Sequence, residues 1–162
     1  SRSLRSLLTV PIPPNQNPAN RARNTVRGTV PVAALLAVVA AVVGVWAAAF
    51  PASFYADFPL PGRHWVSTLG AYNEHLTRDV GGLYLGLLVL TVWAVRRPSV
   101  AGMSVTGGAW LVFDAQHLLW HSLHLGAFSM VDKVGNVVSL VGVLVLSVLL
   151  LVPAREKAPT SQ

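Results

Sequence analysis

The 162-residue sequence contains no cysteine. This absence excludes disulfide bonds, thiolate nucleophiles, iron–sulfur clusters and zinc sites held by thiolates. Three widespread functional signatures are missing as well, because no GxSxG, P-loop or GxGxxG pattern occurs in the chain. The corresponding templates for serine hydrolysis, phosphate binding and dinucleotide binding therefore do not apply.

Charged residues are also scarce. They make up 11% of the sequence, whereas soluble domains average about 25%. Hydrophobic residues account for 53% and are gathered in long runs. Because a transmembrane helix needs about 20 apolar residues, four crossings fit in this chain and little remains for a soluble domain. The composition predicts an integral membrane protein surrounded by the lipid bilayer.

Acidic residues are half as frequent as basic ones, 6 against 12, which gives a formal net charge of +6. The basic residues collect at the ends of the apolar runs. That distribution is typical of membrane orientation and differs from the basic surface patch of a nucleic-acid-binding protein. We therefore expect no nucleic-acid partner.

Four segments are predicted to be helices, at about 30–50, 72–95, 100–122 and 134–152. The first has no charged residue and predicts an uncleaved membrane anchor rather than a signal peptide. The second and third apolar runs, 80–95 and 100–113, are too short to cross a bilayer by themselves. Their helices must therefore continue through the polar residues that precede the second run and follow the third.

The predicted fold is all-α, an integral membrane four-helix bundle with cytoplasmic N and C termini. Residues 1–29 form a basic, proline-containing cytoplasmic tail, 30–152 the four-helix transmembrane domain, and 153–162 a second cytoplasmic tail. The positive-inside rule favours this orientation in a multi-pass protein of the bacterial inner membrane. The basic residues then lie inside at Arg2, Arg5, Arg21, Arg23, Arg27, Arg96, Arg97, Arg155 and Lys157, and outside at Arg63, Arg78 and Lys133.

Small residues at four-residue spacing indicate faces where helices pack closely. Ala40, Gly44 and Ala48 form such a row in the first helix, and Gly82 and Gly86 form a GxxxG pair in the second. We expect both rows to face neighbouring helices.

Polar residues in the second and third helices fall at similar depth in the outer half of the membrane. Asp114, His117, His121 and His124 follow i, i+3, i+7, i+10 spacing and form one helical stripe. A polar stripe facing lipid costs several kcal/mol, so it should face the bundle interior. We predict a pocket between these two helices, roofed by the aromatic-rich 51–70 loop. Its predicted polar residues are Glu74, His75, Arg78, Asp79, Asp114, His117 and His121.

Three ligands fit such a pocket on chemical grounds. A metal ion would bind His117 and His121, with His75 or Glu74 as a third ligand. Haem would need His75 on one face and His117 or His121 on the other. A quinone would be anchored by Arg78 and would exchange a proton with His117, tuned by Asp79 or Asp114. The alternative is that these residues are internal pairs that fix helix packing.

The stretch YNEHLTRDVGGLYLGLLVL, residues 72–90, resembles the DoxX-like superfamily of small four-helix bacterial membrane proteins. The matching positions are Asn73, Arg78, Gly81, Gly82 and Gly86. The resemblance covers roughly residues 30–152 and implies association with membrane oxidoreductase complexes and quinone-linked chemistry. We therefore expect a redox-linked membrane protein that binds a quinone, metal or haem. The alternative expectation is a non-catalytic accessory subunit of a larger membrane complex.

Overall fold

The computed structural model describes residues 18–151, which form helices joined by short connections and contain no β-strand. The long helices are α1 (Pro18–Ala49), α3 (Glu74–Arg96), α4 (Val100–Leu123) and α5 (Met130–Leu151). Shorter elements are α2 (Pro51–Asp57) and the 3-10 turns η3 (Ser67–Leu69) and η4 (Leu125–Ala127). The all-α prediction is confirmed for this part of the chain.

Local signals explain where two of the helices begin. The side chain of Asn73 accepts a hydrogen bond from Leu76 N at 3.1 Å and caps α3. Ser99 caps α4 in the same way, with Gly102 N as its donor at 3.0 Å. Both caps satisfy amide groups that a helix start leaves unpaired. The predicted bounds 72–95 and 100–122 are within two residues of the observed ones.

The predictions failed at three other boundaries. Helix α1 begins at Pro18, so residues 18–29 are helical and not part of a tail, while residues 1–17 and 152–162 lie outside the described residues. Proline fits a first helical turn because its missing N–H would be unpaired there anyway. The 51–70 loop contains the helix α2, which likewise begins with proline. Helix α5 begins four residues before position 134, because Ser129 and Asp132 cap its first turn.

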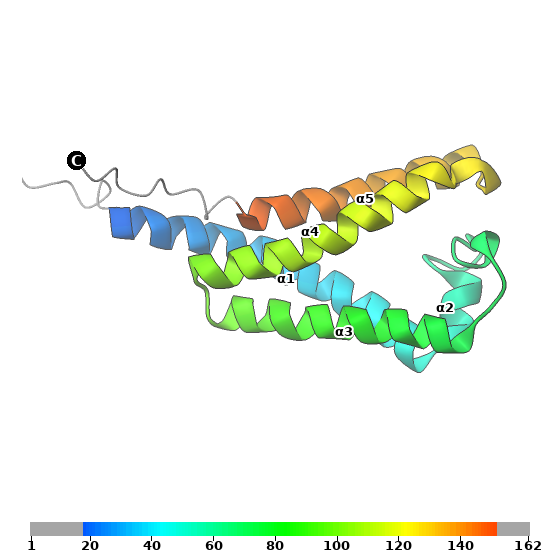
Figure 1. Ribbon diagram of the computed structural model, residues 1–162, viewed down its shortest axis with the longest axis horizontal. Helices are drawn as coiled ribbons and strands as arrows, with labels where there is room; N and C mark the ends of the chain where they lie inside the picture. The colour runs from blue at the N-terminus through cyan, green and yellow to red at the C-terminus, as the bar shows by residue number, and fades with distance from the viewer. Residues whose placement is uncertain (1–17, 152–162) are drawn as a thin grey trace, which may run out of the picture.

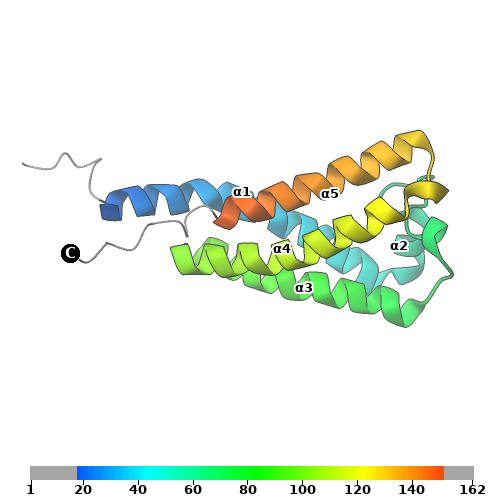
Figure 2. The same cartoon turned by 45° about the horizontal axis from the view of Figure 1, so that its top comes forward.

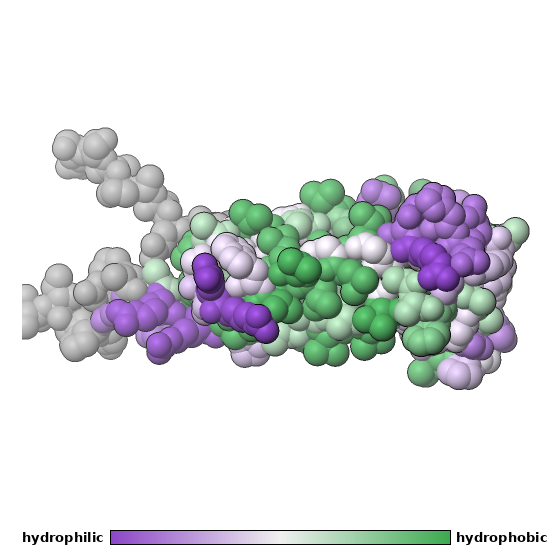
Figure 3. Space-filling view, turned by 90° about the horizontal axis from the view of Figure 1, so that it is seen from below, coloured by the Kyte–Doolittle hydropathy of each residue, from purple (hydrophilic) through white to green (hydrophobic). Residues whose placement is uncertain are grey.

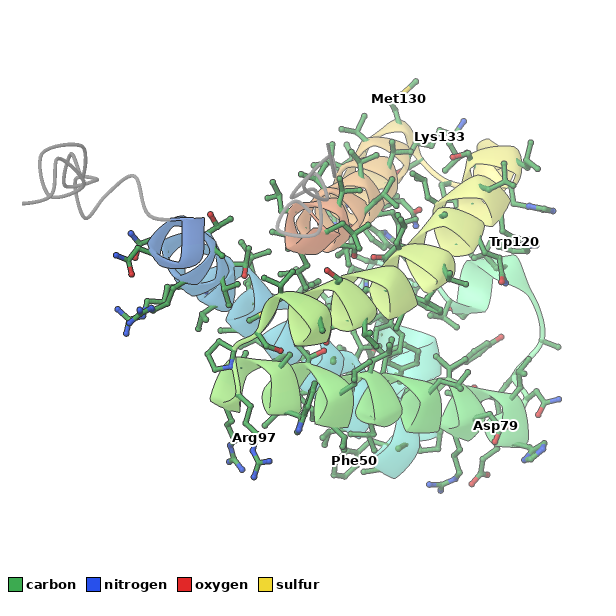
Figure 4. The ribbon with its side chains drawn as sticks, turned by 60° about the vertical axis from the view of Figure 1, so that its left-hand side comes forward. Phe50, Asp79, Arg97, Trp120, Met130 and Lys133 are labelled. Carbon is green, nitrogen blue, oxygen red and sulfur yellow. The ribbon has the colours of Figure 1, made fainter. Side chains whose placement is uncertain are left out.

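The four long helices pack as two antiparallel pairs, α1 with α3 and α4 with α5 (Figure 1). At one end, called the closed end, α3 turns into α4, α5 ends, and the first turns of α1 project past the other helices (Figures 1 and 2). At the opposite end, called the open end, the two pairs diverge and α2 lies beside them. Arg97 and Asp79 lie near these two ends of α3 (Figure 4). The basic residues Arg96 and Arg97 therefore belong to the closed end.

Small residues allow α1 and α3 to approach closely, but not through the predicted glycine pair. A Cβ added to Gly81 would lie 2.8 Å from Cα of Ala48, and one added to Gly44 would lie 3.1 Å from Leu85 N. The row Ala40, Gly44, Ala48 is thus a packing face, as predicted. Gly82 and Gly86 are exposed and meet nothing within 4 Å. The helical rotation turns Gly81 toward α1 and its neighbour Gly82 away from it.

The core of the closed end joins both helix pairs. Leu36, Ala94, Met103, Trp110 and Leu150 are completely buried there. The indole Nε1 of Trp110 donates a 2.9 Å hydrogen bond to Thr91 Oγ1 and links α4 to α3. Apolar burial and a satisfied polar pair therefore hold the two layers together at this end.

At the open end, a short segment fills the space between the diverging pairs. We call residues 58–70, which connect α2 to α3, the cap. Its Phe58 ring lies 4.8 Å from that of Phe54 on α2 and 6.3 Å from that of Trp65 within the cap. Aromatic side chains thus pack together in this connection between α2 and α3.

The outside of the bundle is strongly apolar in its middle. Figure 3 shows a hydrophobic band between hydrophilic ends. Three described helices are long and apolar enough to cross a membrane, spanning Ala22–Ala49, Glu74–Arg96 and Met130–Leu151. Helix α4 is just as long, at 24 residues, but carries Asp114, His117 and His121 and is not one of these three. These properties support a membrane protein with transmembrane helices.

Candidate functional site

A cavity of about 420 Å³ lies at the open end. Its walls come from both helix pairs, α2 and the cap. One side is apolar and includes Val39, Val43, Phe54, Phe58, Leu76 and Val80. The opposite side, from α4 and α5, carries His117, His121, Asn136 and Ser139. An apolar chamber with a few polar groups along one wall is typical of a small-molecule site.

The two histidines stand side by side on α4. Their ring centroids are 4.7 Å apart, and the ring of Phe113 lies 5.1 Å from that of His117. The i, i+4 spacing produces this neighbouring arrangement. Nδ1 of His121 is buried without a hydrogen-bond partner among the described residues. The imidazole pair therefore has a ring nitrogen, His121 Nδ1, that is still able to form a hydrogen bond at this wall of the cavity.

Asn136 is the most enclosed polar residue of the cavity. It is 2% exposed, and its Oδ1 has no hydrogen-bond partner within residues 18–151. Leaving a buried polar atom unpaired costs about 1–3 kcal/mol, so buried amides are nearly always satisfied. The sequence showed Asn136 as one of few polar residues in the fourth apolar run, but gave no reason to select it as a site residue.

The polar cluster of α3 does not join the histidines. Arg78 contacts Glu74 at 2.8 Å and donates through Nη1 to the carbonyl oxygen of Ala48 on α1. His75 lies 3.4 Å from Asp79, and their side chains are 88% and 55% exposed. The cavity instead receives Leu76, Thr77, Val80 and Tyr84 from α3.

The prediction that Glu74, His75, Arg78 and Asp79 share a pocket with His117 is therefore wrong. Equal depth in two neighbouring helices does not fix which faces meet. A helix turns 100° per residue, so positions next to each other in sequence point in different directions. Residues 76, 77, 80 and 84 form one face of α3, and the four charged residues lie outside it.

Asp114 lies outside the cavity as well. It is 5% exposed and accepts a hydrogen bond from Ser147 Oγ of α5. The contact lies within the α4–α5 pair, where Gly107 also packs against Leu150. This residue therefore fits the alternative interpretation of the polar stripe, in which it helps to hold two helices together.

The metal and haem hypotheses find little support in this arrangement. Among the described residues, no three His, Asp or Glu side chains are grouped closely enough to hold a metal ion. Haem ligation by two histidines needs His75 to face His117 or His121. His75 instead projects from the bundle surface, where its side chain is 88% exposed.

The predicted roof over the pocket is present. Cap residues Trp65, Val66 and Leu69 line the cavity. Trp65 Nε1 donates a 2.9 Å hydrogen bond to Asp132 Oδ1 on α5, and Arg63 approaches the same oxygen at 3.4 Å. Sequence reasoning missed Asp132 because the fourth helix was predicted to begin at position 134, which left Asp132 in the preceding connection.

Comparisons with protein-family models, curated proteins and solved structures found no match to this chain.

Proposed function

We propose that the protein is a four-helix integral membrane protein with both termini on the cytoplasmic side. Helices α3, α4 and α5 contain 23, 24 and 22 residues. At 1.5 Å per residue they are about 33–36 Å long, which matches a hydrocarbon core of about 30 Å. Pairing with α5 shields Asp114 from lipid, which favours α4 as the fourth crossing. Arg96 and Arg97 at the closed end favour that end as cytoplasmic.

The cavity, in this proposal, binds a quinone-class molecule, meaning a flat apolar ring with oxygen atoms at its edge. The observation that carries this proposal is Asn136, a buried amide with an unpaired oxygen in a mainly apolar chamber. The hydroxyl of the quinol form would satisfy this oxygen by donating to it, whereas a quinone carbonyl would accept from the N–H of the same amide. This ligand class also agrees with the quinone-linked chemistry that the DoxX-like resemblance implies.

The chemistry of the polar wall suits either redox form of such a ligand. A neutral imidazole has one N–H donor and one acceptor nitrogen, and an amide has both kinds of group. A quinone carbonyl would accept from His117 or from the Asn136 amide, and a quinol hydroxyl would donate to them. His117 is the candidate for proton exchange because its imidazole lines the cavity and has both a donor and an acceptor nitrogen. Asp79, Asp114 and Arg78 have no direct part in this version, since none of them lines the cavity.

The test is titration of decyl-ubiquinone into protein purified in mild detergent, followed by calorimetry. Asn136→Leu should weaken binding at least tenfold, because the ligand loses its buried hydrogen-bond partner. Thr91→Val is the matched control, since it removes another buried polar group at the closed end and should leave binding unchanged. Absence of wild-type binding, or equal binding by Asn136→Leu, would overturn the proposal. A Soret band or stoichiometric metal in the purified protein would replace the quinone with haem or a metal ion.

A second candidate function is an accessory subunit of a membrane oxidoreductase complex. The exposed charged face of α3 favours it, because Glu74, His75 and Asp79 point away from the cavity at the open end. Such a face offers hydrogen-bonding groups to another subunit. Replacing His75 and Asp79 by Ala should then prevent co-purification of the complex while leaving decyl-ubiquinone binding intact. Unchanged co-purification would reject this second function.

A further inference from the structure

The cap is attached to the two helix pairs very unequally. On the side of α1, α2 and α3, the Tyr55 hydroxyl donates to Gly70 O at 2.7 Å and the ring of His64 contacts Ala56 O. The Phe58 ring also packs on Phe54. On the side of α4 and α5, its only hydrogen bonds within the described residues are those that reach Asp132. A single carboxylate therefore holds the cap to the second helix pair.

The same side chain that reaches this carboxylate also lines the cavity. The indole of Trp65 lines the chamber and packs against Gly135, where an added Cβ would lie 3.1 Å from Trp65 Cζ2. Gly135 precedes Asn136, the buried amide of the proposed ligand site. The indole N–H thus points to Asp132 while the indole ring lies against Gly135 at the edge of the chamber.

The arrangement of the helices supplies a direction for movement. The helix pairs are joined by the core of the closed end and diverge toward the cap (Figures 1 and 2). The cap lies at the start of α5 in the second of these views. Separation of the cap from Asp132 would open the cavity at its outer end without disturbing the closed-end core.

We propose that the cap is the gate of the cavity and that the Trp65–Asp132 hydrogen bond is its latch. The identity of the ligand rests on the proposed function, but the gate itself rests on contacts within this chain. In the closed state the indole N–H donates to the Asp132 carboxylate and the ring packs against Gly135, the residue before Asn136. In the open state the bond is broken and the chamber is accessible from the outer surface.

Asp132 has a second role that affects the choice of variants. It accepts a 2.6 Å hydrogen bond from Ser129 Oγ and its backbone N–H donates to the same oxygen, so it also caps α5. Replacing Asp132 would disturb both interactions. Trp65→Phe removes the latch donor together with the outer indole carbons that pack on Gly135, and it keeps an aromatic ring without disturbing the α5 cap. Ser129→Ala removes the capping contact and leaves the latch in place, which makes it the matched control.

The absence of cysteine allows a direct test with one introduced thiol. Thr77 lines the cavity and is 9% exposed, so Thr77→Cys reports on access to the chamber. Labelling by a water-soluble maleimide should be about tenfold faster in Trp65→Phe, the factor expected for losing a hydrogen bond to a charged group. Ser129→Ala should change the rate less than twofold. Gly135→Ala places a methyl group against the indole ring of Trp65. This variant should raise the labelling rate by a smaller factor.

The possible results distinguish failure of the gate proposal from failure of the quinone proposal. If Trp65→Phe and Gly135→Ala both label at the unmodified rate, the gate is wrong whether or not a quinone binds. If Ser129→Ala accelerates labelling as much as Trp65→Phe, loss of helix capping explains the effect and the latch is wrong. If labelling accelerates as expected but decyl-ubiquinone does not bind the wild-type protein, the gate stands and the quinone proposal fails.

Discussion

The two ends of the bundle are built on opposite principles. At the closed end, side chains are completely buried and the polar pair Trp110–Thr91 is satisfied within the protein. At the open end, the helix pairs diverge around a cavity, and the amide oxygen of Asn136 is buried without a partner. The closed end therefore has the features of a stabilising core, whereas the open end has those of a binding site.

This contrast explains how one small bundle combines a stable scaffold with an accessible site. A cavity removes van der Waals contacts between side chains and leaves polar groups unpaired. It therefore lowers the stability of the part of the protein that contains it. The completely buried side chains of the closed end lie away from the cavity. Local instability is commonly concentrated at ligand-binding elements, which agrees with the proposed opening of the cap.

The largest expected effect tests the core of the closed end. Trp110→Ala should lower the free energy of unfolding by about 3–5 kcal/mol, because it leaves a cavity and removes the donor to Thr91. The free energy is measured by circular dichroism during titration with SDS in mild detergent. Trp120→Ala is the control at the open end, where the residue is 44% exposed. A loss for Trp120→Ala as large as for Trp110→Ala would contradict the division into two ends.

The next effect tests the close approach of α1 and α3. Gly81→Ala should destabilise the protein by about 1–3 kcal/mol, because its Cβ would overlap the backbone of Ala48. Gly82→Ala meets nothing within 4 Å and should be neutral or stabilising by up to about 1 kcal/mol, since alanine favours helix. The same unfolding titration compares these neighbours. Equal effects at the two positions would show that the α1–α3 packing described above is incorrect.

The glycine pair also shows what the sequence predicts and what it leaves open. Long apolar runs predicted all four long helices, and the caps at Asn73 and Ser99 lie close to the predicted starts of α3 and α4. The rotation of each helix about its own axis was not predictable with the same accuracy. An error of one residue turns the face by 100°, which is the difference between Gly82 and Gly81.

Some features of the candidate site were likewise predicted from the sequence, and others were not. His117 and His121 share a face because their spacing on one helix requires it, and the aromatic loop covers them as predicted. The charges of α3 were assigned to the same pocket from depth alone, and they lie elsewhere. Asn136 lines the cavity and Asp132 binds the cap. Both residues are important only because the fold places them beside residues that are distant in sequence. Their role could not be predicted from local pattern.

A smaller effect is expected midway between the two ends, at the contact of Asp114 with Ser147. Ser147→Ala should cost about 1 kcal/mol, the usual value for a hydrogen bond between membrane helices. Ser139→Ala is the control, because the Ser139 hydroxyl bonds to Asn136 O of its own helix. Unfolding titrations of the two variants should differ in midpoint. An unchanged midpoint for Ser147→Ala would mean that this pair contributes nothing to α4–α5 packing.

The smallest expected effect, that of Asn136→Leu, is opposite in sign to the effect of the matching substitution at the closed end. Thr91→Val removes the acceptor of a satisfied buried bond and should destabilise the ligand-free protein by about 1–2 kcal/mol. Asn136→Leu removes an acceptor that has no partner, so it should raise the free energy of unfolding by about 0.5–1 kcal/mol. Both variants are compared by unfolding titration without ligand. With decyl-ubiquinone present, the wild-type protein should gain stability and Asn136→Leu should not, because only the wild-type amide can bond to the ligand. If Asn136→Leu instead destabilised the ligand-free protein, Asn136 would be a structural residue like Thr91, and the open end would have no unsatisfied group awaiting a ligand.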